Sequence, residues 1–191
     1  MKYLINIIIL IFSAASLSAA TGTVPDSVFI YSTYHKIVRH ANPPNDYLWQ
    51  PILEIKEDKQ LYAGVDIFYS SEEDNFGFEI ILTTGLLIEL VDNDEDILAF
   101  ILSHELAHIC LHHIQFKRGT LPGIIHNAIC REDEFTADKK ALELAVEAGY
   151  KYDNILSGIK KIAAKSSEMS ILESLNKNHP PWIERIADID Q

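Results

Sequence analysis

The pattern His-Glu-x-x-His at residues 104–108 constrains this chain more than any other sequence feature, because it lies inside an apolar segment. Residues 97–116 carry apolar side chains at the spacing of a buried helix. Positions i and i+4 share one helix face, so His104 and His108 can reach the same metal ion. Glu105 lies beside that face and can reach a water on the metal. A buried helix does not carry such polar side chains without partners, which favours a metal site over chance.

A catalytic metal site needs a third protein ligand and an open coordination position. One common arrangement adds a Gly and a His after the pattern, but Leu111 and Ile114 occupy those positions and exclude it. The other arrangement takes a Glu from a second helix, and residues 131–138 are the strong candidate. Glu134 and Asp138 share a helix face there, so Glu134 can bind the metal while Asp138 orients a His ligand.

The remaining polar residues near these segments are expected to play minor parts. His112 and His113 could suggest a second metal, but the ligand set is already complete without them. We therefore expect them at the surface or supporting a ligand. Glu132 and Asp133 are expected to form a solvated acidic face.

The first half of the chain predicts one helix followed by short strands. Val, Ile, Tyr and Phe are enriched in the predicted strands. The expected elements are a helix at Pro25–His40, strands at Ile52–Ile55, Leu61–Tyr69 and Phe76–Leu82, and an acidic turn at Ser70–Asn75. The last strand is either an edge strand able to pair with an extended peptide or an ordinary core strand.

The second half predicts helices. Asp92-Asn93-Asp94-Glu95 starts the first, where carboxylates complement exposed N–H groups, and Lys117-Arg118-Gly119 is the expected end. Later helices are expected within Ile124–Ala148, closed by Gly149, at Asp153–Lys165, and after Pro180-Pro181. The predicted fold class is α+β, a small sheet beside a helical bundle.

The N-terminus has the pattern of a secretory signal peptide. Lys2 precedes the apolar run Leu4–Phe12, and Ser18-Ala19-Ala20 is an acceptable cleavage site. The alternative is a retained anchor, but the run is short for a span, which needs about 20 residues. We expect residues 1–20 to be removed, residues 21–191 to form one domain, and the protein to be exported, periplasmic or secreted.

Composition narrows the classes of partner. The chain has 191 residues, enough for one ordinary domain, and a formal net charge of −12. No cluster of Lys and Arg stands out, which argues against nucleic acid and against an anionic membrane surface. No segment after the N-terminal run is long and apolar enough to span a bilayer, so we expect no membrane span after cleavage.

Taken together, the motifs resemble those of the M48 family of gluzincin zinc metallopeptidases. The matching pieces, in order, are Thr84-Gly85-Leu86-Leu87, His104–His108, Arg131–Asp138, Asn178-His179-Pro180 and Arg185-Ile186. The chain lacks the family's multiple membrane spans and helical-repeat domain. It is similar to the soluble periplasmic members reduced to the catalytic domain.

The resemblance implies a helical gluzincin-like metallopeptidase domain with a small β-sheet beside the HExxH helix. It implies one Zn²⁺ per chain, bound by His104, His108 and Glu134, with Glu105 as the catalytic base. His179 and Arg185 would line the cleft and assist catalysis.

The expected activity is hydrolysis of peptide bonds by a zinc-activated water. The expected substrates are peptides or unfolded proteins, with a role in extracytoplasmic protein quality control. Two alternatives remain: a non-catalytic zinc module that binds polypeptides in the manner of a chaperone, and a zinc hydrolase of small substrates. An intact Glu105 favours catalysis, because zinc binding alone does not need a base there.

The two cysteines predict no disulfide, although export and an even count suggest one. Cys130 precedes Glu134 by one helical turn and leans toward the metal, whereas Cys110 points away from it. We expect both to be buried free thiols.

Overall fold

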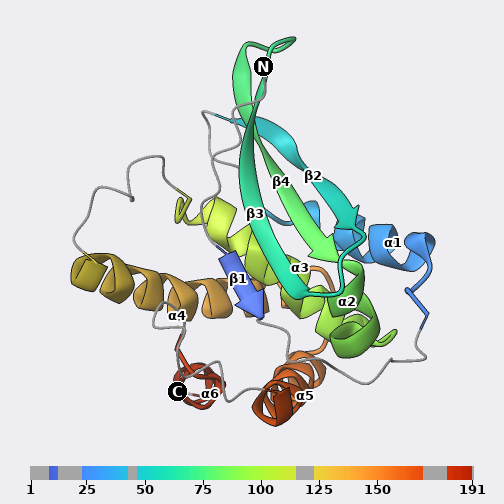
Figure 1. Ribbon diagram of the computed structural model, residues 1–191, viewed down its shortest axis with the longest axis vertical. Coiled ribbons are helices and arrows are strands. Elements are labelled where there is room, and N and C mark those ends of the chain that lie inside the picture. The colour runs from blue at the N-terminus through green and yellow to red at the C-terminus, as the bar shows by residue number, and fades with distance from the viewer. Residues whose placement is uncertain (1–8, 13–22, 43–46, 115–122, 170–179, 191) are drawn as a thin grey trace.

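A computed structural model describes residues 9–12, 23–42, 47–114, 123–169 and 180–190 and shows a mixed α+β fold (Figure 1). The predicted α+β class is thus confirmed. The elements are β1 (Ile9–Phe12), α1 (Ser27–Val38), β2 (Leu48–Lys56), β3 (Leu61–Ser70), β4 (Asn75–Thr83), α2 (Thr84–Leu86), η1 (Leu87–Val91), α3 (Glu95–Cys110), α4 (Gly123–Glu147), α5 (Tyr152–Met169) and α6 (Trp182–Ile189).

The sheet has the strand order β1-β3-β4-β2. β3 and β4 form an antiparallel hairpin whose far end projects from the helical body, and β2 pairs with β4 in parallel (Figure 1). Because β4 pairs with β2 on one side and β3 on the other, the edge-strand alternative is wrong, and β4 is a core strand. Its inner residues are buried accordingly, among them Ile80 and Leu82.

The short strand β1 pairs antiparallel with the start of β3, with Leu10 opposite Ala63. β1 lies within the segment that the sequence assigns to a signal peptide. Removal of that segment would leave the start of β3 as an open edge of the sheet.

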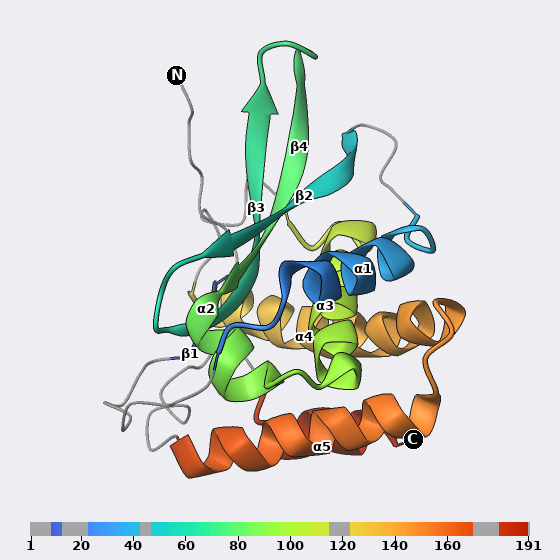
Figure 2. The same cartoon turned by 90° about the vertical axis from the view of Figure 1, so that its right-hand side faces the viewer.

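Helix α3 lies at the centre of the molecule. Every residue from Ile97 to Ile109 is buried, because the sheet, α1, α4 and α5 surround the helix (Figure 2). Asp94 caps its N-terminus as expected, accepting hydrogen bonds from the backbone N–H groups of Asp96 and Ile97. Side chains on α3 are therefore held in a rigid core, where a polar group needs a partner.

Helix α3 ends at Cys110, earlier than the apolar pattern predicts. His112 adopts a left-handed conformation with φ 56°, which turns the chain away from the helix axis. The backbone N–H of His112 bonds to the carbonyl of Ile109, and that of His113 bonds to the carbonyl of His108. This pair of bonds is a Schellman termination, which satisfies the last carbonyls without a glycine. The expected end at Lys117-Arg118-Gly119 lies outside the described residues.

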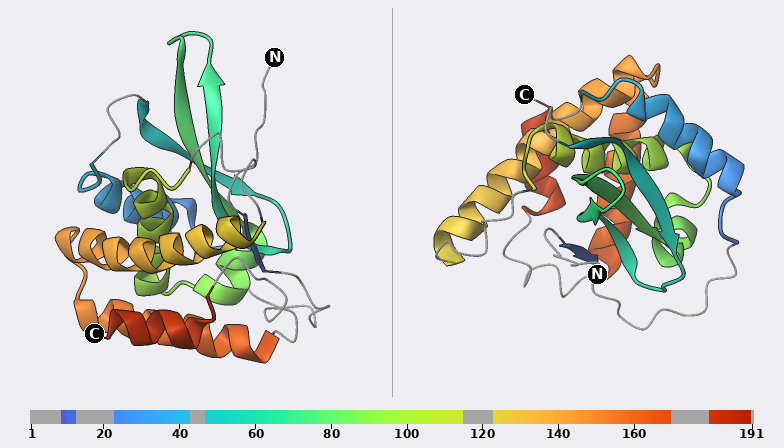
Figure 3. Two further views of the ribbon diagram at one scale, coloured as in Figure 1. Left: turned by 90° about the vertical axis from the view of Figure 1, so that its left-hand side faces the viewer. Right: turned by 90° about the horizontal axis from the view of Figure 1, so that it is seen from above.

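Helices α4, α5 and α6 pack on the far side of α3 from the sheet (Figure 3). Their positions confirm the three predicted helices. Gly149 closes α4 with φ 90°, which needs no strain at a glycine, and Pro181 precedes α6. No helix in the described part of the chain has both the length and the apolarity to cross a membrane.

Candidate metal centre

Three side chains from two helices converge in the core. His104 and His108 come from α3, and Glu134 comes from α4. The two His Nε2 atoms are 3.0 Å apart, and each lies 3.4 Å from an oxygen of Glu134. All three residues are buried. Among the described residues, these three form the group whose ligand atoms could hold a metal ion.

The spacing of the three ligand atoms fits a small tetrahedral cation. Ligands about 2.0–2.1 Å from zinc at tetrahedral angles stand roughly 3.3 Å from one another. The observed separations of 3.0, 3.4 and 3.4 Å bracket that value. Two imidazoles and one carboxylate are also a donor set of catalytic zinc sites. The residues present therefore fit a bound metal ion.

The carboxylate of Asp138 contacts the His104 ring at the nitrogen that does not face the other ligands. Asp138 Oδ1 lies 3.0 Å from His104 Nδ1, so the Nδ1–H donates to the carboxylate and Nε2 is left to bind a metal. Burial lowers the pKa of His104, but the hydrogen bonds to Asp138 and Glu134 more than offset this and raise it to about 10.

Arg185 of α6 completes this buried network. Its guanidinium donates to both oxygens of Asp138, at 2.7 and 2.6 Å, and lies 3.3 Å from Glu134. Burial raises the pKa of Asp138, but the charge of Arg185 and its hydrogen bonds hold it below its ordinary value. The guanidinium also lies 4.0 Å from the ring of Trp182, a cation–π contact.

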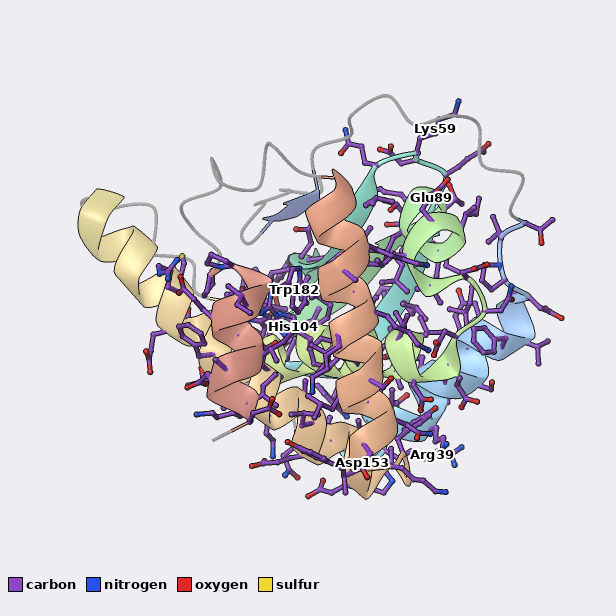
Figure 4. The ribbon with its side chains drawn as sticks, turned by 90° about the horizontal axis from the view of Figure 1, so that it is seen from below. Arg39, Lys59, Glu89, His104, Asp153 and Trp182 are labelled. Atoms are coloured by element: carbon purple, nitrogen blue, oxygen red, sulfur yellow. The ribbon has the colours of Figure 1, made fainter. Side chains whose placement is uncertain are left out.

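A small, mainly apolar pocket opens beside the ligands, and Glu105, His104 and Arg185 are the polar residues that line it. Trp182 of α6 and His104 of α3 both line this pocket, and Figure 4 shows their positions from below. The other lining side chains are mainly apolar: Leu86, Leu90, Phe100, Ile101 and Ile162. The carboxylate of Glu105 is thus placed at the wall of a mainly apolar pocket.

Tyr62 of β3 lies near enough to Glu105 for the charge of that carboxylate to act on its hydroxyl. Burial, with the nearby charges of Asp66 and Glu105, raises the pKa of Tyr62. The hydroxyl of Tyr62 therefore stays protonated at neutral pH and keeps a hydrogen to donate. Its neighbour Ala63 lines the pocket.

The structure therefore brings together all the predicted site residues that it describes: His104, Glu105, His108, Glu134, Asp138 and Arg185. His179 lies outside the described residues. Arg185 lines the pocket as expected, but its charge is already engaged by Asp138 and Glu134.

Two expectations about neighbouring residues are wrong. Asp133 is buried and lies 3.5 Å from His113 Nε2, so it is not on a solvated face. The cysteines are free as expected, but Cys110 and Cys130 are half-buried instead of buried. The sequence did not identify Asp133 because α4 carries polar residues along its length. The spacing of these residues does not show which carboxylate contacts the turn that follows α3.

Comparison with known proteins agrees with this geometry. The models of two peptidase families match parts of the chain. The model of Peptidase family M48 matches residues 30–122, and that of Peptidase U49 matches residues 96–190. These matches support an M48-family metallopeptidase domain and indicate a protease. A search of the curated proteins finds no match.

Proposed function

We propose that the protein is an exported zinc-dependent metalloendopeptidase that hydrolyses peptide bonds in peptides or unfolded proteins. The observation that carries the proposal is the convergence of His104, His108 and Glu134 on one point, with Glu105 beside them in an apolar pocket. Two imidazoles and a carboxylate would supply the three protein ligands that catalytic zinc sites use.

In this proposal, His104, His108 and Glu134 hold a Zn²⁺ ion. When bound, zinc lowers the pKa of its water to about 7 and polarises the scissile carbonyl. Glu105 takes the proton of the attacking water and passes it to the leaving amine. The apolar walls of the pocket exclude bulk water, which strengthens these charge interactions.

The surrounding residues hold the site in shape. Asp138 fixes the ring orientation and tautomer of His104. Arg185 contacts both Asp138 and Glu134 and so connects helix α6 to the ligand helix α4.

The burial of Glu105 favours catalysis over a purely polypeptide-binding zinc module. Glu105 is 1% exposed and lines the same apolar pocket as the ligand His104, where its carboxylate can reach a water on a bound metal. A binding module gains nothing from a carboxylate at this place. The apolar pocket would accept an apolar side chain of an unfolded chain, in agreement with a role in extracytoplasmic protein quality control.

The test compares a variant of the proposed base with a variant of a proposed ligand. Zinc content and cleavage of an unfolded protein substrate are measured for both, and the fragments are identified by mass spectrometry. Glu105→Gln should keep its zinc and lose nearly all turnover, because Glu105 is not a ligand. Glu134→Ala should lose zinc and turnover together. Ordinary turnover by Glu105→Gln would refute the proposed base, and zinc retained by Glu134→Ala would refute the ligand set. Zinc binding without any cleavage by the unmodified protein would favour the binding module.

A further inference from the structure

The end of helix α3 folds back toward the metal centre. His112 and His113 form the Schellman turn, in which the N–H of His113 bonds to the carbonyl of His108 at 3.0 Å. In such turns the side chain that follows the left-handed residue commonly contacts the side chain of the residue whose carbonyl accepts this bond, usually as an apolar contact. Here that contact joins two imidazoles, whose Nδ1 atoms are 3.1 Å apart. The turn thus presents the His113 ring to a metal ligand.

We propose that Asp133 and His113 together position His108 as a metal ligand, through a hydrogen-bonded chain that runs from Asp133 through His113 to His108. The inference rests on the proposed metal function of His104, His108 and Glu134. It assigns a role to two residues that the motif pattern leaves out. His113 and Asp133 are positioning residues, since neither reaches the metal or the substrate.

The contacts around His113 determine which nitrogen carries its proton. Its Nε2 lies 3.5 Å from Asp133 Oδ1 and 3.3 Å from Thr136 Oγ1. The Thr136 hydroxyl donates to backbone carbonyls of its own helix, at 3.1 Å, so toward His113 it acts as an acceptor. Two acceptors at Nε2 place the proton there. The Nδ1 of His113 is then left with a lone pair.

The proton on His113 Nε2 fixes the tautomer of His108 in turn. Since His113 Nδ1 accepts, the hydrogen bond between the two rings requires the proton on His108 Nδ1. The Nε2 of His108, which faces His104 and Glu134, is then the atom with a free lone pair. This is the tautomer that a metal needs, so the chain prepares His108 for binding before the ion arrives.

Both His ligands are therefore oriented by carboxylates of the same helix, α4. Asp138 contacts His104 directly, whereas Asp133 acts on His108 through His113. Glu134 on α4 is itself a ligand. A helix that supplies one ligand and both orienting carboxylates couples the packing of α3 against α4 to the geometry of the site.

The test measures zinc affinity by competition with a chromophoric chelator, alongside the thermal midpoint of the metal-free protein. His113→Phe keeps an aromatic ring but removes the acceptor, and it should weaken zinc binding about 10- to 100-fold. His113→Asn keeps an acceptor near the position of Nδ1 and should recover part of the loss. His112→Asn is the matched control: it is adjacent and exposed, Asn tolerates the left-handed backbone, and zinc affinity should match that of the unmodified protein.

Asp133→Asn gives an independent test that keeps His113 in place. The introduced amide can donate its N–H₂ to His113 Nε2, which moves the proton of His113 to its Nδ1. The Nδ1–H groups of His113 and His108 then face each other as two donors. Zinc affinity should fall while the metal-free thermal midpoint stays within a few degrees. Unchanged zinc affinity in both His113→Phe and Asp133→Asn would overturn the inference. A protein that binds no zinc at all, before any substitution, would instead refute the metal centre and with it the proposed function.

Discussion

Replacing Arg185 by methionine should destabilise the protein strongly, because it removes the charge that compensates two buried carboxylates. The Arg185 and Asp138 side chains are 3% and 1% exposed. The guanidinium makes two hydrogen bonds to Asp138 and also contacts Glu134. Methionine fills a similar length with an apolar chain, so packing changes little and the lost charge dominates.

The size of the effect follows from burial. Removing one partner of a buried ion pair costs about 3–5 kcal/mol, because the other charge stays in the core without compensation. For a domain of this size, each kcal/mol shifts the thermal midpoint by about 2–4 °C, so the expected drop is roughly 6–20 °C. The loss of the contact with the Trp182 ring adds to this in the same direction.

Arg131→Met is the matched control. Arg131 also joins α4 to α6, through a 2.6 Å contact with Glu184, but its side chain is 36% exposed. An exposed pair of this kind is worth about 0–1 kcal/mol. Urea denaturation in the presence of a chelator, which removes the contribution of bound metal, gives both free energies of unfolding. If Arg185→Met cost no more than Arg131→Met, the argument from buried charge would fail.

Three further predictions follow from the same structure. The free energy of unfolding should decrease as pH falls below about 4, because Arg185 holds the pKa of Asp138 below its ordinary value. The stability that this contributes is present above the pKa of the unfolded group and is lost as the folded group protonates. A pH-independent difference in stability between the unmodified protein and Arg185→Met across that range would contradict this. Thiol titration of the denatured, unreduced protein should find two free thiols, Cys110 and Cys130, and none would show that a disulfide forms. N-terminal sequencing of exported protein should start near Thr21, and an intact leader on membrane-bound protein would contradict this.

Much of the fold was predictable because local signals agree with the tertiary structure. Asp94 caps α3, Gly149 closes α4, and Pro181 precedes α6, each for a local backbone reason. The end of α3 was not predictable in the same way. A left-handed His112 terminates the helix, although histidine at this position carries no strong sequence signal.

The candidate metal site was predictable to the extent that helical spacing places its residues. His104 and His108 share a helix face at i and i+4, and so do Glu134 and Asp138. The contact between Asp133 and His113 depends on how a turn after α3 meets α4, which no local spacing encodes. The position of β4 inside the sheet likewise depends on its pairing with β2 across the fold.

The most direct test of the account is turnover measured while metal-free protein is titrated with zinc. Cleavage of an unfolded protein should be absent without metal, rise in proportion to added zinc and reach a break at one equivalent per chain. Glu105→Gln should bind the same single equivalent and show almost no cleavage throughout. Cleavage that persists in the metal-free protein, or that needs two equivalents, would contradict a single zinc ion bound by His104, His108 and Glu134.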